Sequence, residues 1–136
     1  MSYASASALQ AAVYQRLVAD TAVSALVGGA IYDAVPPGPL PPLYLSIGPE
    51  DVHDRSDKTG RGAEHDFTVS VVSDAAGFQT AKALAEAVSD ALVGADLTLA
   101  RGQLVELWFL RARARRVGAA DQRRIDLWFR ARVDID

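Results

Sequence analysis

Two groups of side chains in this sequence could do chemistry: a pair of histidines among carboxylates, and a dense run of arginines. His53 lies in the acidic segment Glu50–Asp54, and His65 lies between Glu64 and Asp66. Imidazole and carboxylate donors together could hold a divalent metal. The segment has no fixed helical spacing that would turn several donors toward one point. We therefore expect a solvated acidic stretch, with no metal and no cofactor.

The arginines form the second candidate site, and three interpretations of them remain open. Guanidinium groups match phosphate geometry, so the run could bind phosphate or nucleic acid. It could instead be a solvated strand face paired with Asp126, Asp134 and Asp136. It could also be an interface between subunits, where arginine and aromatic residues are enriched; Trp108 and Trp128 favour this third interpretation. The eight residues are Arg111, Arg113, Arg115, Arg116, Arg123, Arg124, Arg130 and Arg132.

The overall composition narrows the class of protein. The length of 136 residues fits one domain, residues 1–136, and 50% hydrophobic residues are enough for a core. The net charge of −3 argues against a dedicated nucleic-acid binder. The absence of cysteine excludes disulfides and zinc–thiolate sites. No apolar run reaches the roughly 20 residues that a membrane span needs, and no signal peptide is evident, so we expect a protein made in the cytoplasm that does not contact membranes.

The arginines lie on a long predicted hairpin at the C-terminal end. Apolar and polar residues alternate strictly from Ile125 to Ile135, which is typical of a strand with one buried face. A similar alternation runs from Leu104 to Arg115. The polar break Gly118–Gln122 joins the two runs, so they predict one antiparallel hairpin. An arginine-rich hairpin of this length is better suited to docking than to catalysis.

The rest of the chain predicts an α+β domain of two layers. We expect a four-stranded antiparallel sheet with helices packed on one face, in the order helix-strand-strand-helix-strand-strand. A proline-rich connector over 36–42 is rigid and extended, and a long mobile loop is expected over about 50–64. The predicted helices cover 7–19, 21–26 and 78–92; the predicted strands cover 31–33 (brief), 43–47, 65–73 and the hairpin.

The combined order of these segments resembles the tail-terminator, or tail-completion, proteins of long-tailed phages and gene transfer agents. The resemblance covers nearly the whole chain. The matching pieces are the helix Leu9–Leu17, Ala25-Leu26-Val27-Gly28, Ile31-Tyr32-Asp33-Ala34-Val35-Pro36, Pro42-Leu43-Tyr44-Leu45-Ser46-Ile47-Gly48, His65 to Ser73, Gly77-Phe78 with the helix to Leu92, and Phe129-Arg130-Ala131-Arg132-Val133.

The resemblance implies a structural role in a virion or gene-transfer-agent tail. Such proteins form rings, usually hexameric, that cap the tail tube, stop its growth and offer a surface to the head connector. DNA passes through the ring only in transit. The resemblance implies no catalytic residue.

Two sets of residues are the candidate sites for this role. We expect the subunit contact at or near Trp108, Trp128, Arg111, Arg113, Arg130 and Arg132. We expect the polar loop to face the tube or the lumen and to become ordered on docking, with an acidic half that repels DNA. The loop residues expected to face the tube or the lumen are Glu50, Asp51, His53, Asp54, Asp57, Lys58 and Arg61.

Three alternatives remain. A head–tail connector, or stopper, shares the ring symmetry and small size. A small metal- or nucleotide-dependent enzyme would use His53, His65 and their carboxylates. A nucleic-acid-binding module would use the arginine hairpin.

Overall fold

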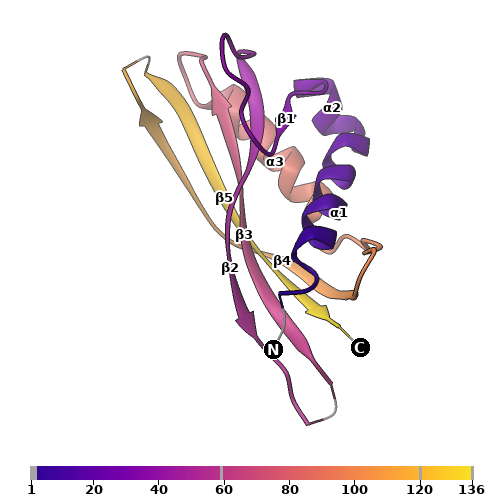
Figure 1. Cartoon of the computed structure of the whole chain (residues 1–136). Coiled ribbons are helices and arrows are strands. Elements are labelled where there is room, and N and C mark those ends of the chain that lie inside the picture. The colour runs from indigo at the N-terminus through magenta and orange to yellow at the C-terminus, as the bar shows by residue number, and fades with distance from the viewer. Residues whose placement is uncertain (1–2, 59, 120, 136) are drawn as a thin grey trace.

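The protein consists of three helices packed on one side of a five-stranded sheet (Figure 1). The computed structural model describes residues 3–58, 60–119 and 121–135. The elements are α1 (Ala6–Ala19), α2 (Thr21–Val27), β1 (Ile31–Tyr32), β2 (Leu43–Asp54), β3 (Gly62–Ser73), α3 (Gln79–Leu92), β4 (Gln103–Val117) and β5 (Gln122–Asp134).

The sheet has the strand order β1-β2-β3-β5-β4 and is mixed. The pairs β2–β3, β3–β5 and β5–β4 are antiparallel, whereas β1 pairs parallel to β2, with Ile31 opposite Leu45. The prediction of four antiparallel strands is therefore wrong in strand number and in the direction of one edge. A two-residue strand carries too short a pattern to reveal its partner or its direction.

The predicted loop over 50–64 is also wrong at both of its ends. β2 continues to Asp54 and β3 begins at Gly62, so residues 55–61 alone connect the two strands. The resulting hairpin projects past the helices at the end of the molecule where both termini lie (Figure 1).

Because glycine and proline interrupt strands, Gly48 and Pro49 predicted the end of a strand at Ile47. In the structure β2 continues through both residues. The register between β2 and β3 shifts between Ile47 and Glu50, so the glycine and the proline lie in a bulge. A bulge tolerates proline because local ladder hydrogen bonds are already lost there. Beyond the bulge, β2 carries polar groups on both faces, which removes the alternation that predicts a strand.

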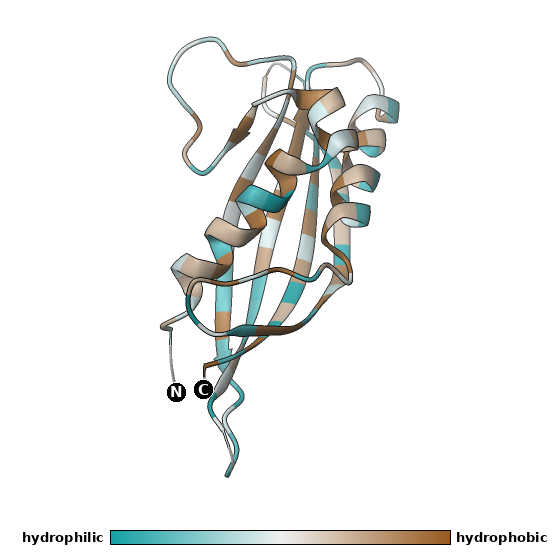
Figure 2. Ribbon diagram, turned by 90° about the vertical axis from the view of Figure 1, so that its right-hand side faces the viewer, coloured by the Kyte–Doolittle hydropathy of each residue, from teal (hydrophilic) through white to brown (hydrophobic). Residues whose placement is uncertain are grey.

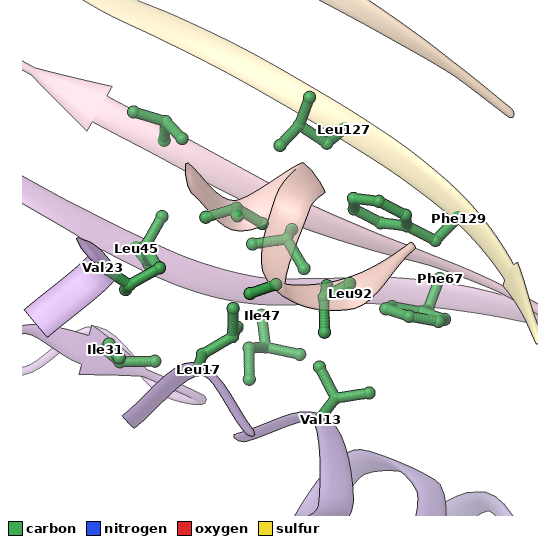
Figure 3. Close-up of a cluster of buried hydrophobic side chains, with 14 of the residues drawn as sticks. Val13, Leu17, Val23, Ile31, Leu45, Ile47, Phe67, Leu92, Leu127 and Phe129 are labelled. Carbon is green, nitrogen blue, oxygen red and sulfur yellow. The ribbon is translucent and has the colours of Figure 1, made fainter. Parts of the chain in front are cut away.

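The core lies between the helices and one face of the sheet (Figure 3). Phe129 is fully buried and stacks on Phe67, with the ring centroids 5.6 Å apart. Burying each larger side chain of the core stabilises the fold by at most about 1.5–3 kcal/mol. Figure 2 shows the corresponding alternation of hydrophobic and hydrophilic residues along the strands behind the helices. The helix α3 contributes Ala81, Leu84, Ala85, Val88, Ala91 and Leu92, the stripe expected from its spacing.

The N-terminal helices and the proline-rich connector close the β2 side of the sheet. The Asp20 carboxylate accepts a hydrogen bond from the Val23 backbone N–H and so caps α2. Leu40 of the connector packs against buried Tyr44 and Val72. Across the described residues, no helix has the length and apolar character needed to cross a membrane.

Candidate functional site on the helix-free face and the free edge

Most of the arginines that the sequence singled out lie on the face of the sheet opposite the helices: Arg111, Arg113, Arg115, Arg124, Arg130 and Arg132. Phe67 lies opposite Phe129 in the ladder, and both point into the core. Because successive strand residues point to opposite faces, their neighbours point away from the helices. We call this surface the helix-free face; its rows include Asp66 opposite Arg130 and Thr68 opposite Trp128.

Asp66 and Arg130 form the shortest ion pair among the described residues of the helix-free face. The Arg130 Nε–H and Nη2–H donate to the two carboxylate oxygens of Asp66 over 2.7 and 2.9 Å. This two-point contact is the geometry that guanidinium and carboxylate groups favour. The hydrogen bond from Arg130 lowers the pKa of Asp66, and the same contact raises the pKa of Arg130.

Asp126 organises a second charge cluster nearer the β4–β5 turn. It is buried, and its Oδ1 accepts hydrogen bonds from the Ser70 hydroxyl over 2.6 Å and from the Arg124 Nε–H over 2.9 Å. Arg115 approaches the other oxygen at 3.4 Å. Burial raises the pKa of Asp126, but the hydrogen bonds from Ser70 and Arg124 outweigh burial, so the net pKa is lowered.

Arg111 and Arg113 differ from the other arginines because neither forms an ion pair among the described residues, although Arg113 lies opposite Asp126 in the ladder. The Arg111 guanidinium lies over the indole of Trp128, with its carbon 3.7 Å from the ring centroid. Arg113 is exposed and has no ion pair among the described residues. Trp108 lies opposite Arg130 in the ladder and, like Trp128, is half-buried.

The other six arginines of the run are engaged within the molecule. Arg116 and Arg123 pair with Asp121, and Arg132 pairs with Asp134 at 3.5 Å and donates to the Arg55 carbonyl. Asp136, which the sequence offered as a further partner, lies outside the described residues. The solvated-face interpretation thus accounts for most of the charge, and little of it is left for phosphate.

The two histidines do not form a joint site. Val52 lies opposite His65, and His53 lies opposite Glu64, so the two imidazoles point to opposite faces of the sheet. His65 is buried and its Nδ1 lies 3.6 Å from the Glu50 carboxylate, while His53 is exposed. No group of three metal-ligating side chains occurs within residues 3–58, 60–119 and 121–135.

The residues expected to face a partner from the loop divide between strand and turn. Glu50 points to the helix side, where it accepts a hydrogen bond from the Tyr3 hydroxyl over 2.6 Å. Asp51 is exposed on the helix-free face, opposite Asp66. The remaining members are exposed near the hairpin end: His53, Asp54, Asp57, Lys58 and Arg61.

The sequence did not predict a group of exposed apolar side chains on the edge strand β4. Val105, Phe109 and Leu110 are 58%, 42% and 37% exposed. The register with β5 shifts at Leu104/Glu106 and at Phe109/Arg111, so Val105 and Leu110 are the extra residues of two bulges. The change of phase at Leu110, where an apolar run meets the first arginine of the alternation, is the signal in the sequence that marks the second bulge.

The structure thus shows a charged helix-free face and an edge strand with exposed apolar side chains. The chain belongs to the family described as tail completion protein gp17, whose model matches residues 11–134. It is also similar to a chain of a solved structure described as the virion of a native gene transfer agent (GTA) particle. The two chains are 73% identical; the alignment covers 98% of this chain and 99% of the other, with a TM-score of 0.92. No curated protein matches the chain.

Family membership confirms the resemblance that the sequence suggested. It also shows that the alternative of a small metal- or nucleotide-dependent enzyme is wrong. Tail completion proteins are structural components and not enzymes. The separation of His53 from His65 agrees with this assignment.

Proposed function

We propose that this protein is the tail terminator of a gene transfer agent or a related phage-type particle. It forms a ring, with six copies as the expected number, on the end of the polymerised tail tube. The ring stops the addition of tube subunits and offers its opposite side to the head connector. DNA passes through the ring without sequence-specific contacts.

One observation carries the proposal: a tail-completion fold whose arginine–tryptophan hairpin supplies the edge strand β4, with a turn-proximal half whose outer side no strand of the described residues covers. The contact between Arg111 and Trp128 holds a large amphipathic surface at this edge, and Arg113 beside it has no carboxylate partner among the described residues. Arginine and tryptophan dominate the energetics of protein interfaces. In a cyclic ring each subunit uses two different patches, and this edge supplies one of them.

The β2–β3 hairpin is the part of the molecule suited to reach the tube or the lumen. Its end projects beyond the helical layer (Figure 1). The exposed Asp51 and Asp54 make the β2 arm acidic, whereas the connection 55–61 carries Asp57 together with the exposed Arg55, Lys58 and Arg61. Carboxylates facing the lumen would repel DNA phosphates and keep DNA from adhering during passage.

Polymerisation of the tail tube tests the proposal. Purified tube subunits are allowed to elongate with and without this protein, and tube length is measured by electron microscopy. A terminator shortens the tubes in proportion to its concentration and is found at one tube end. Unchanged tube growth together with binding to the portal complex would contradict the proposal and favour the stopper.

A further inference from the structure

We infer that the free edge of β4 in one copy pairs with the free half of β2 in the next copy, so that the sheets of neighbouring subunits are continuous. This inference rests on the proposed ring and names the two patches that the ring requires. β2 and β4 lie toward opposite sides of the sheet, separated by β3 and β5 (Figure 1). They are therefore two different surfaces, as head-to-tail assembly demands.

Both edges have backbone groups without a strand partner. β4, Gln103–Val117, is the last strand of the sheet. The Gly94 backbone N–H donates to the Leu107 carbonyl over 3.0 Å, and beyond Leu110 no such contact is made to β4 by the described residues outside β5. On β2, the pairing with β1 is confined to Leu45 and Ser46, so within the described part of the chain no strand covers the outer edge beyond Ile47. Unpaired strand edges are templates for another strand.

The directions of the two strands suit antiparallel pairing between copies. β2 is antiparallel to β3, β3 to β5 and β5 to β4, so β2 and β4 run in opposite directions within one sheet. A second copy that continues the sheet on the β4 side presents its β2 antiparallel to β4. Antiparallel strands form the more stable ladder.

Charge determines which edges can meet. The turn-proximal half of β4 carries Arg111, Arg113 and Arg116, all exposed, whereas β2 beyond the bulge carries Glu50 and Asp51. Across the ladders Arg113 is level with Ser46, and Asp51 is level with Trp108. The two charged halves therefore meet when the next copy is shifted along the strands by about five residues. Two β4 edges would bring arginines together, and two β2 edges would bring carboxylates together; like charges directly opposite destabilise a strand pair. Bulges, a proline and charges also protect edges against aggregation. The charges on the two edges have opposite signs. They therefore disfavour contacts between identical edges and favour the contact of β4 with β2.

The apolar surface beside β4 would be covered by the same contact. A groove of about 300 Å³ lies between α3 and the edge strand; its lining includes Phe109, Ala112 and Ala114. The matching side of the next copy has a hollow of about 540 Å³ between α1 and β2, lined by residues that include Tyr14 and Glu50. Continuing the sheet also continues the helical layer, which brings the α1 side of one copy to the α3 groove of the other.

Charge reversal tests this pairing in the full chain. Arg113→Glu and Asp51→Arg change exposed side chains that have no ion pair among the described residues. Arg113 lies opposite Asp126 and Asp51 opposite Asp66 in the ladders, so Arg113→Glu should lower the thermal unfolding midpoint whereas Asp51→Arg should not. Assembly is therefore compared well below both midpoints. Each single variant should raise the protein concentration at half-assembly about tenfold or more, because juxtaposed like charges are strongly unfavourable. The double variant should assemble like the wild type.

Arg101→Glu and Asp96→Arg, exposed in the 93–102 loop, serve as matched controls and should have no effect. Assembly is followed by light scattering, alone and with tail-tube subunits.

The outcomes separate this inference from the proposed function. Wild-type mass in both single variants, with tubes still capped, would overturn the edge pairing and leave the terminator assignment intact. A wild-type protein that remains monomeric even with tube subunits would overturn both. Because the chain lacks cysteine, a second readout is available: a mixture of Asp51→Cys and Arg113→Cys proteins should cross-link with a short bis-maleimide, and Asp51→Cys mixed with Arg101→Cys should not.

Discussion

Arg111 lies over Trp128 across the β4–β5 ladder, with 3.7 Å between its guanidinium carbon and the centroid of the indole. The arrangement leaves Trp128 half-buried on a face that no helix covers. The contact fixes two long side chains in the free monomer, so binding a partner here costs little additional side-chain entropy. A rigid, partly covered tryptophan is thus ready for contact before assembly begins.

Replacing Trp128 by alanine is predicted to reduce assembly more than stability. The variant loses the platform under Arg111 but leaves the opposite, helix-covered face intact, so the free energy of unfolding should fall by only about 1 kcal/mol. Assembly should weaken roughly tenfold or more, since tryptophan at an interface centre carries a large share of binding energy. Urea unfolding and light scattering measure the two effects. Trp128→Phe, which keeps an aromatic face, should retain most of the assembly; normal assembly of the alanine variant would argue against the contact.

For Phe129, which neighbours Trp128 but points into the core, we predict a large loss of stability. Phe129 is fully buried, and Phe129→Ala should lower the free energy of unfolding by about 3–5 kcal/mol. Phe109 touches the same ring edge-on, with the centroids 6.0 Å apart, but is 42% exposed on β4. Phe109→Ala should therefore cost about 1 kcal/mol in stability and act mainly on assembly. Equal destabilisation by the two variants in urea unfolding would show that the β4 edge is part of the folded core.

The Asp66–Arg130 pair predicts a pH dependence on the acid side. The pKa of Asp66 is lowered in the folded protein, so the pair contributes its full stability above the ordinary aspartate pKa of about 3.9. The contribution is lost as the pH falls through the lowered folded-state pKa. Asp66→Asn should reduce the free energy of unfolding by about 1–2 kcal/mol at pH 7, and the difference from wild type should shrink below about pH 4. Urea unfolding at several pH values measures this. Asp96→Asn, at an exposed site without an ion pair among the described residues, is the control; a constant difference for Asp66→Asn across the range would refute the linkage.

Shortening the β2–β3 hairpin tests its assignment to the tube or the lumen. Residues 56–61 can be replaced by a two-residue Asn-Gly turn, which keeps Arg55 opposite Gly62 and suits an antiparallel hairpin. The thermal midpoint should change little, because the removed residues lie beyond the core and most are exposed. Ring formation should persist while binding to tail tubes is lost, as measured by co-sedimentation. If binding to tubes is undiminished, the hairpin is not the tube contact, and the contact lies elsewhere on the protein.

The parts of the fold that the sequence predicted share one property: their pattern has a single period over many residues. The alternation from Ile125 to Ile135 and the stripe of α3 each bury one face, so their period is determined by the core. The outer half of β2 could not be predicted in this way. Glu50 points to the helix side and Asp51 to the helix-free face, so polar residues occupy both faces and no alternation remains.

The candidate site shows the same limit. The sequence gathered the arginines and tryptophans correctly onto one hairpin, but it could not assign partners to them. Whether Arg130 is free or held by Asp66 depends on a cross-strand register between residues 64 positions apart. The bulges that expose Val105 and Leu110 are local shifts of that register, and a change of phase in the pattern is their sole trace in the sequence.

The mass of the assembled protein in solution tests the central claim most directly. Light scattering is recorded over a range of protein concentrations, alone and with tail-tube subunits. The terminator assignment predicts a closed species of six copies of the 14.5 kDa chain, either alone or induced by the tube, with no larger species as concentration rises. A monomer under every condition, or open-ended growth without closure, would contradict it.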